Sequence, residues 1–167
     1  MNGIYENIRG LSRRIVGICA ERGFKVAAAE SCTGGMISAA ITGVPGSSDV
    51  IELGVCSYSN RIKREVLGVN KQTLDLHSEY SAECAEEMAR GVLKLAGADF
   101  AVSTSGVAGP SGGTDENPVG TVYICVCGRD GARSERIVFP DNGRENIRAA
   151  AAEKALAMLL EKAEGYK

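Results

Sequence analysis

The segment 27–41, AAAESCTGGMISAAI, limits the possible folds of this chain more than any other segment does. A short apolar run at 26–29 leads into Ser31, and Gly34 and Gly35 separate that serine from a stretch rich in alanine and isoleucine. The pattern predicts a buried strand, a tight turn and the beginning of a helix, because glycine permits both the sharp turn and the close approach of a ligand. The segment therefore predicts an α/β unit with a candidate site at its corner.

Ser31 has two interpretations at that corner. A nucleophile on a strand–turn–helix corner is exposed to substrate, and the free N–H groups and dipole of the new helix favour negative charge there. A serine or threonine in front of a helix also serves as an N-cap. The segment alone leaves both interpretations open.

The remaining sequence predicts helices that alternate with strands. Apolar residues at helical spacing predict helices over 5–22 and 81–96 and a last helix opened by residues 141–143. The segment 34–42, rich in alanine and isoleucine, predicts another helix, and 62–67 is expected to form a short helical turn. Apolar or alternating runs predict strands over 24–29, 50–58, 100–105, 121–127 and 133–139, the last two as a hairpin. Residues 71–80 show only a weak polar pattern. The expected fold is α/β, a three-layer α/β/α sandwich with a mixed, mostly parallel sheet of about five strands, and residues 1–167 are expected to form one domain.

The composition argues against nucleic-acid and membrane partners. The formal net charge is −2 with no basic run, and the chain has 3 Phe, 5 Tyr and no Trp for stacking on bases. No apolar stretch approaches the ~20 residues of a membrane span, and the first residues lack a signal-peptide pattern. We therefore expect a cytoplasmic protein.

The 6 cysteines and 1 histidine form no recognisable metal-binding pattern, since no two cysteines make a C-x-x-C pair. Cys125 and Cys127 share one face of a predicted strand, where a metal pair is the alternative to two buried apolar thiols. His77 lies in the weak polar stretch, away from any strand end, and is a poor candidate for a catalytic base. We expect no metal and no cofactor.

Three stretches are expected to meet at one edge of the sheet, because ligands bind beyond the carboxyl ends of parallel strands. They are the turn at Ser31, the turn at 58–63 and the loop after Ser105. A serine needs a base, and Lys63 can serve if burial favours its neutral form, with Tyr58 orienting or relaying the proton. Taken singly, a lysine in this position is more often a solvated surface residue, and a tyrosine at the position of Tyr58 is more often a strand-end aromatic.

The loop SGVAGPSGGTDENPVG, residues 105–120, is long and rich in glycine. Its backbone N–H groups make it a candidate phosphate cradle, although no Walker motif is present. Arg144 and Arg148 lie near the start of the last helix and could pair with a phosphate. Their alternative is an ordinary solvated helix start.

Four of these motifs together resemble the CinA C-terminal-domain family: AESCTGG (29–35), YSN..K (58–63), GVAGPSGGT (106–114) and PVGTVY (118–123). The resemblance implies the sandwich fold, a homo-oligomer, and hydrolysis of nicotinamide mononucleotide to nicotinate mononucleotide and ammonia in pyridine-nucleotide recycling. It places the family's serine, tyrosine and lysine on Ser31, Tyr58 and Lys63. The expected substrate-binding residues are Thr33, Gly34, Gly35, Asn60, Ser105, Gly106, Gly109, Gly113 and Arg144.

The chain departs from the family pattern at two positions. Ser111 stands where many members have an acidic residue, and Asn117 where they have a lysine, so no charged role is assigned there. Some relatives also carry an N-terminal molybdopterin-binding-like domain. We do not expect that domain here and do not transfer its chemistry.

In the expected reaction, neutral Lys63, helped by Tyr58, takes the Ser31 proton, and backbone N–H groups of residues 32–35 stabilise the oxyanion. The loop 105–114 and Arg144 hold the phosphate. Cys32 is a rival nucleophile, since thiolates form readily at helix starts. The alternative function is a non-catalytic nucleotide-binding or interaction module linked to competence or DNA damage.

Overall fold

A five-stranded mixed sheet forms the middle layer of the protein, whose structure is a computed structural model that describes residues 2–166. The strand order is β2-β1-β3-β4-β5. Parallel pairs join β1 (Val26–Glu30) to β2 (Ile51–Cys56) and to β3 (Phe100–Gly106), and antiparallel pairs join β4 (Thr121–Gly128) to β3 and to β5 (Gly131–Val138). The parallel pairing is therefore confined to β2-β1-β3, and β4 alone runs against the other four strands.

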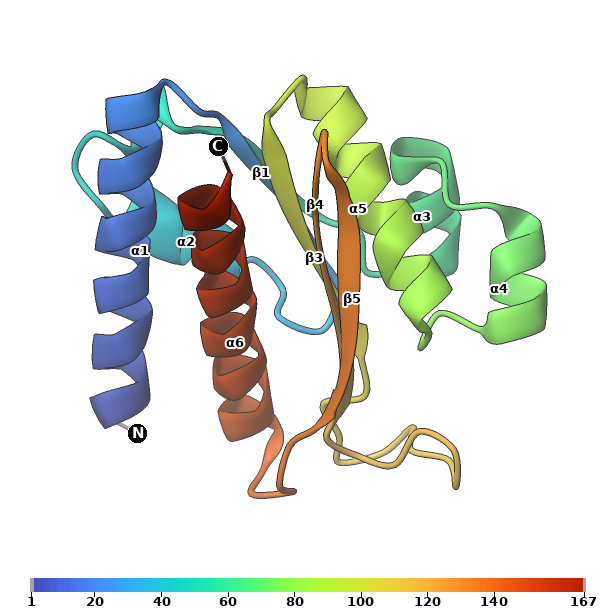
Figure 1. Ribbon diagram of the computed structural model, residues 1–167. Helices are drawn as coiled ribbons and strands as arrows, with labels where there is room; N and C mark the ends of the chain where they lie inside the picture. The colour runs from blue at the N-terminus through green and yellow to red at the C-terminus, as the bar shows by residue number, and fades with distance from the viewer. Residues whose placement is uncertain (1, 167) are drawn as a thin grey trace.

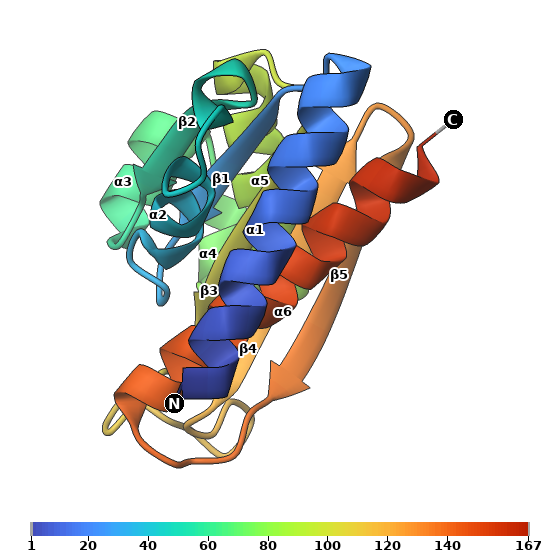
Figure 2. The same ribbon diagram turned by 90° about the vertical axis from the view of Figure 1, so that its left-hand side faces the viewer.

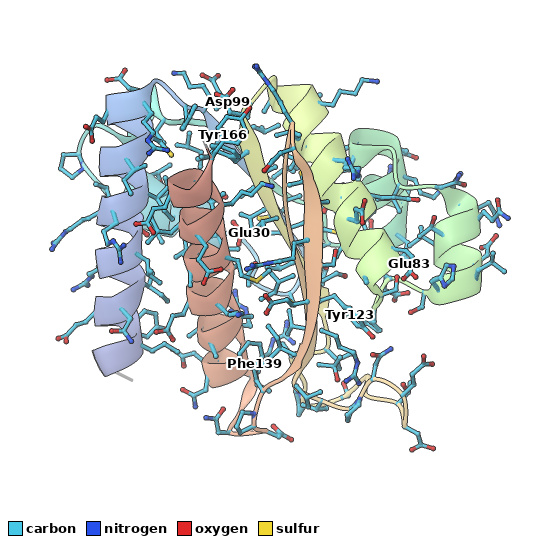
Figure 3. All side chains as sticks on the ribbon, viewed as in Figure 1. Glu30, Glu83, Asp99, Tyr123, Phe139 and Tyr166 are labelled. Carbon is cyan, nitrogen blue, oxygen red and sulfur yellow. The ribbon has the colours of Figure 1, made fainter. Side chains whose placement is uncertain are left out.

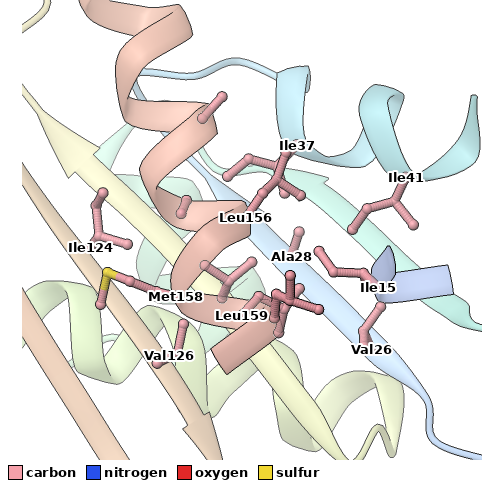
Figure 4. Packing of buried hydrophobic residues seen from close by; sticks show 14 of the residues in the cluster. Ile15, Val26, Ala28, Ile37, Ile41, Ile124, Val126, Leu156, Met158 and Leu159 are labelled. Atoms are coloured by element: carbon pink, nitrogen blue, oxygen red, sulfur yellow. The ribbon is translucent and has the colours of Figure 1, made fainter. Parts of the chain in front are cut away.

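One face of the sheet is covered by α1 (Asn2–Arg22), α2 (Met36–Thr42) and α6 (Arg144–Gly165), with α1 and α6 side by side (Figures 1 and 2). Aliphatic side chains of these helices fill the space over β1 and β4. Figure 4 shows Ile15 of α1, Ile37 of α2 and Leu156 of α6 beside Ala28 of β1, all of them 0% exposed. This burial is the main force that holds the layer in place.

The opposite face is covered by α5 (Ala82–Ala96), and α3 (Asn60–Leu67) and α4 (Lys71–His77) pack against α5 on that side of the sheet (Figure 1). A second cluster forms there, in which Met88 and Val92 of α5 pack with Cys125 and Cys127 of β4. The two strand cysteines are thus buried members of a core, and no group of three or more potential metal ligands occurs within residues 2–166.

The predicted three-layer sandwich and the predicted hairpin are confirmed, with element bounds that differ by a few residues. The weak polar stretch, for which the sequence predicted no element, contains α4, which begins after the N-cap Asn70. None of its residues is buried, so it carries no apolar periodicity that could have revealed it. No helix in the described part of the chain has the length and apolar character needed to cross a bilayer.

The register of the parallel strands brings three chain ends together. Glu30, the last residue of β1, pairs with Cys56 at the end of β2 and with Thr104 near the end of β3. The turn after β1, the turn after β2 and the loop after β3 therefore leave the sheet at the same edge, next to each other.

Candidate active site

A cavity of about 350 Å³ lies at this edge of the sheet. Its walls come from the turn after β1, the turn that leads into α3, the segment before α5, and the loop after β3. The three stretches expected to meet do so in the structure, and seven predicted site residues line the cavity: Ser31, Tyr58, Asn60, Lys63, Gly106, Gly109 and Arg144.

Ser31 and Lys63 lie against each other at this cavity. Ser31 immediately follows β1, and Lys63 lies in the first half of α3, whose N-cap Ser59 accepts a hydrogen bond from the Ile62 N–H. The Lys63 Nζ to Ser31 Oγ distance is 3.2 Å. The N-cap of α2 is Gly35 and not Ser31, so the capping interpretation of this serine is wrong.

Lys63 is 1% exposed, so its interpretation as a surface lysine is wrong. Removal from water lowers the pKa of the Lys63 amine below its ordinary value, although the nearby Cys84, Glu79 and Cys32 act in the opposite direction. No carboxylate lies within ion-pair distance of Nζ in residues 2–166. An amine in this setting is suited to accept a proton from the hydroxyl beside it.

Cys32 is the neighbour of Ser31 and also borders the cavity. Burial raises the pKa of the Cys32 thiol to about 11, although Lys63 and Thr104 act in the opposite direction. At neutral pH this thiol is protonated, and the thiolate needed for attack is scarce. The geometry and the acid–base chemistry both favour Ser31 over Cys32 as nucleophile.

The N-terminus of α2 is occupied by Glu30, whose side chain is 0% exposed (Figure 3). Its carboxylate accepts hydrogen bonds from the N–H groups of Gly35, Ile37 and Ser38, at 2.8–3.1 Å. The hydroxyls of Thr33 and Ser38 donate to it as well. The negative charge that the sequence predicted at this helix start is supplied by Glu30 of the protein itself. Within the expected oxyanion donors of residues 32–35, the Gly34 and Gly35 N–H groups are already bonded, to the Ser31 carbonyl and to Glu30, so that part of the expectation is wrong.

Arg148 of α6 holds the turn after Ser31 from the other side. Its guanidinium donates to the Cys32 carbonyl at 3.0 Å and to the Thr33 carbonyl at 2.9 Å. Both contacts are charge-assisted and fix the two peptide planes next to the nucleophile. Arg148 therefore positions the turn and does not line the cavity. This position does not support the phosphate contact that the sequence suggested for Arg148.

Tyr58 and Arg144 form the mouth of the cavity. Arg144 donates to the Tyr58 hydroxyl at 2.9 Å and to the Gly109 carbonyl at 2.8 Å, which ties the turn after β2 to the loop after β3. Tyr58 is 63% exposed, and no hydrogen bond joins it to Ser31 or Lys63 in the described residues. This geometry favours a binding role at the entrance over a proton relay.

The loop after β3 forms part of the cavity wall. Ala108 and Gly109 line it, and their N–H groups have no acceptor within residues 2–166. Behind the loop, Asn117 accepts a hydrogen bond from the Tyr123 hydroxyl at 3.0 Å and donates to the Tyr80 carbonyl at 3.3 Å. The loop is thus anchored to the segment before α5, while the Ala108 and Gly109 N–H groups form no hydrogen bond within residues 2–166.

Five predicted binding residues do not line the cavity: Thr33, Gly34, Gly35, Ser105 and Gly113. Thr33 and Gly35 donate to the Glu30 carboxylate, and Gly34 donates to the Ser31 carbonyl, so these three shape the turn. Ser105 donates to the Glu79 carbonyl at 2.6 Å. Gly113 lies farther along the loop, against Val119.

Sequence reasoning missed Glu79 and Tyr80, which line the cavity from the segment before α5. They fall in the weak polar stretch, where no periodicity or motif marked them. The one local signal near them is Ser81, the N-cap of α5, which accepts a hydrogen bond from the Cys84 N–H at 3.1 Å. It indicates that Glu79 and Tyr80 belong to the turn in front of a helix. His77 does not line the cavity; its imidazole is 4.0 Å from Glu83.

Comparison with known proteins gives consistent matches. The family model described as CinA C-terminal domain matches residues 8–163. A CinA-like protein of Shewanella sediminis is 44% identical over 159 residues, covering 95% of this chain and 38% of the relative. A protein of Shewanella oneidensis named nicotinamide-nucleotide amidohydrolase PncC is 47% identical over 137 residues, covering 82% of this chain and 32% of the relative. The chain thus spans about a third of the length of these curated relatives.

Solved structures show the same fold. The competence/damage inducible protein CihA of Agrobacterium tumefaciens superposes with a TM-score of 0.90 at 41% identity, covering 92% of this chain and 94% of that one. The competence damage-inducible protein A of Klebsiella pneumoniae superposes with a TM-score of 0.91 at 38% identity, covering 96% and 99%.

Proposed function

This chain belongs to the CinA C-terminal domain family, and we propose that it hydrolyses the carboxamide of nicotinamide mononucleotide to nicotinate mononucleotide and ammonia. The observation that carries the proposal is the buried Ser31–Lys63 pair, with 3.2 Å between Oγ and Nζ at the floor of a cavity. The amidohydrolase name of the Shewanella oneidensis relative supports the same reaction class.

The reaction begins with the neutral Lys63 amine, which takes the proton from the Ser31 hydroxyl while Oγ attacks the carboxamide carbon. The tetrahedral intermediate collapses as the protonated amine returns that proton to the leaving nitrogen, and ammonia departs. A water molecule then attacks the acyl ester and gives a proton to Lys63, and Ser31 recovers its proton when the acid is released. Tyr58 and Arg144 stand at the entrance, where they hold the nucleotide.

The oxyanion is stabilised by the backbone next to the nucleophile. The Ser31 carbonyl accepts a hydrogen bond from the Gly34 N–H at 3.1 Å, inside the turn. Because the carbonyl and N–H of a trans peptide point in opposite directions, the Cys32 N–H points out of the turn. Such a donor typically contributes ~3–4 kcal/mol to the transition state. Arg148 holds the carbonyls of the next two peptides and thereby the part of the turn that follows this donor.

The phosphate is held by the loop after β3. The N–H groups of Ala108 and Gly109 and the Arg144 guanidinium are the donors at this part of the cavity. Backbone amides together with an arginine suit a phosphate monoester.

The test is release of ammonia from nicotinamide mononucleotide by the wild type and by Ser31→Ala, Lys63→Met and Cys32→Ala. We expect Ser31→Ala and Lys63→Met to lose on the order of a thousandfold or more in turnover. Cys32→Ala is the matched control, because it alters a buried neighbour of the same turn, and it should retain turnover within about threefold.

Turnover that survives in Ser31→Ala and disappears in Cys32→Ala would contradict the assignment of the nucleophile. Tight binding of the mononucleotide by the wild type without ammonia release would contradict the enzymatic function and favour the binding-module alternative. Far-UV circular dichroism of each variant separates a loss of chemistry from a loss of fold.

A further inference from the structure

Glu79 is a cavity-lining residue to which the proposed reaction gives no task. Among the described residues that line the cavity around Ser31, it alone carries a carboxylate. It is half-buried and lies in the segment between α4 and α5. Its position therefore places a negative charge in the space where the substrate is expected to bind.

The backbone and side chain of Glu79 are held by different partners. The carbonyl accepts the Ser105 hydroxyl at 2.6 Å, which ties this segment to the end of β3. One carboxylate oxygen, Oε2, accepts a hydrogen bond from Asn60 Nδ2 at 3.3 Å. The other oxygen, Oε1, has no hydrogen-bond partner within residues 2–166. The carboxylate is thus positioned from one side and open on the other.

The charges around the cavity have opposite signs in different parts of its lining. Arg144 carries the positive charge and is tied to Tyr58 and Gly109 at the mouth. Lys63 must be neutral to act as a base, and no other lysine or arginine of the described chain lines this cavity. A ligand that fits has an anionic part, which suits the arginine and the loop amides, and a separate part that tolerates or attracts a carboxylate.

We propose that Glu79 determines specificity by selecting a carboxamide whose ring carries a positive charge, an N-substituted pyridinium, over the same carboxamide on a neutral ring. This inference rests on the proposed function and deepens it. A carboxylate beside a cation in a partly desolvated cavity attracts it more strongly than in open solvent, because neither water nor salt screens the pair fully. Hydrogen bonding alone would not distinguish the two rings, since both carry the same carboxamide.

The test compares the affinities of two ligands that differ in ring charge. They are nicotinamide mononucleotide and its 1,4-dihydro form, which has the same carboxamide, ribose and phosphate but a neutral ring. Affinity is measured by calorimetric titration in a Ser31→Ala background, because ring charge also changes the reactivity of the carboxamide and would confound turnover. The variants are Ser31→Ala alone, with Glu79→Gln, and with Glu83→Gln as the matched control.

Glu79→Gln removes the charge and keeps an oxygen that can accept from Asn60. Glu83 lies in the first turn of α5 (Figure 3). It carries a carboxylate four residues after Glu79 but does not line this cavity. We expect Ser31→Ala to bind the oxidised mononucleotide at least about tenfold more tightly than the dihydro form. Glu79→Gln should reduce this preference on the order of tenfold by weakening the oxidised ligand alone, and Glu83→Gln should leave it unchanged.

A preference that stays unchanged in Glu79→Gln would overturn the inference. This holds whether both affinities are retained or both fall by the same factor, and an equal fall would indicate a structural role. Both results leave the proposed function standing if the wild type releases ammonia from the mononucleotide. No binding of either ligand, together with no ammonia release by the wild type, would overturn the proposed function and this inference with it.

Discussion

Replacement of Glu30 by glutamine tests how much of the domain's stability resides in the turn that carries the nucleophile. Five donors converge on the Glu30 carboxylate, three of them backbone N–H groups at the start of α2. Glutamine has nearly the same shape, so the substitution opens no cavity. It removes the negative charge and replaces one acceptor oxygen by an amide group that can only donate.

The magnitude follows from the partners of each oxygen. With the glutamine oxygen at the Oε2 position, the Thr33, Gly35 and Ile37 donors keep an acceptor but lose the charge, which costs about 1 kcal/mol for each bond. The amide nitrogen then faces the Ser38 N–H, and a buried N–H without an acceptor costs about 1–3 kcal/mol. Relief of the desolvation of a buried charge offsets part of this loss. We expect a net decrease of about 3 kcal/mol in the free energy of unfolding.

The assay is equilibrium denaturation in urea, followed by far-UV circular dichroism, together with thermal unfolding. A decrease of about 3 kcal/mol corresponds to a Tm lower by about 6–12 °C for a domain of this size. Glu86→Gln is the matched control: the same substitution at an exposed ion pair with Arg90 should cost at most about 0.5 kcal/mol. A decrease below about 1 kcal/mol in Glu30→Gln would refute the reasoning, because the charge would then contribute little to the turn.

Three further predictions follow from the same structure. Burial lowers the pKa of Lys63 below its ordinary 10.5. Turnover should therefore rise with pH as the amine loses its proton, and it should reach a plateau below pH 10.5. Lys63→Arg, whose side chain stays charged, should lose about 10²–10⁴-fold in kcat. Arg148→Met should lower kcat about tenfold with little change in KM, measured by steady-state kinetics, because it frees two carbonyls of the nucleophile turn; an effect on KM alone would contradict a positioning role. Gly91→Ala should destabilise the domain by about 2–4 kcal/mol in urea denaturation, since its Cβ would lie 2.0 Å from the Leu67 carbonyl oxygen, whereas Gly17→Ala meets nothing within 4 Å and should be neutral or stabilising.

The comparison between sequence and structure is clearest at α4 and at the start of α2. Apolar periodicity did not reveal α4, because none of its residues is buried, and its one local signal is the N-cap Asn70. At α2, the glycines correctly indicated a tight turn, but the free helix start they implied is filled by the Glu30 carboxylate. A local sequence pattern indicates the path of the backbone, but it does not indicate which side chain folds back onto that backbone.

The family motifs predicted more of the candidate site than the local sequence patterns did. They named Ser31, Tyr58 and Lys63 as a set, and the structure places all three on one cavity. Their separate roles are a different matter: Lys63 lies at hydrogen-bond distance from Ser31, whereas the Tyr58 hydroxyl is engaged with Arg144 at the mouth. The catalytic assignment of these residues stays a prediction, and the kinetic variants above test it.

Spacing along the chain predicted the helices and strands other than α4, and their alternation predicted the sandwich and the approach of three strand ends. Each helix or strand depends on the spacing of apolar residues within a short stretch of chain, and the sequence shows this spacing directly. The burial of Lys63 beside Ser31, 32 residues away, and the contact of Arg148 with Cys32, 116 residues away, follow from the tertiary packing. Burial shifts a pKa because it removes the group from water, and a hydrogen-bond partner fixes a peptide plane because it lies against it. In both cases the surrounding groups come from residues that are distant in sequence.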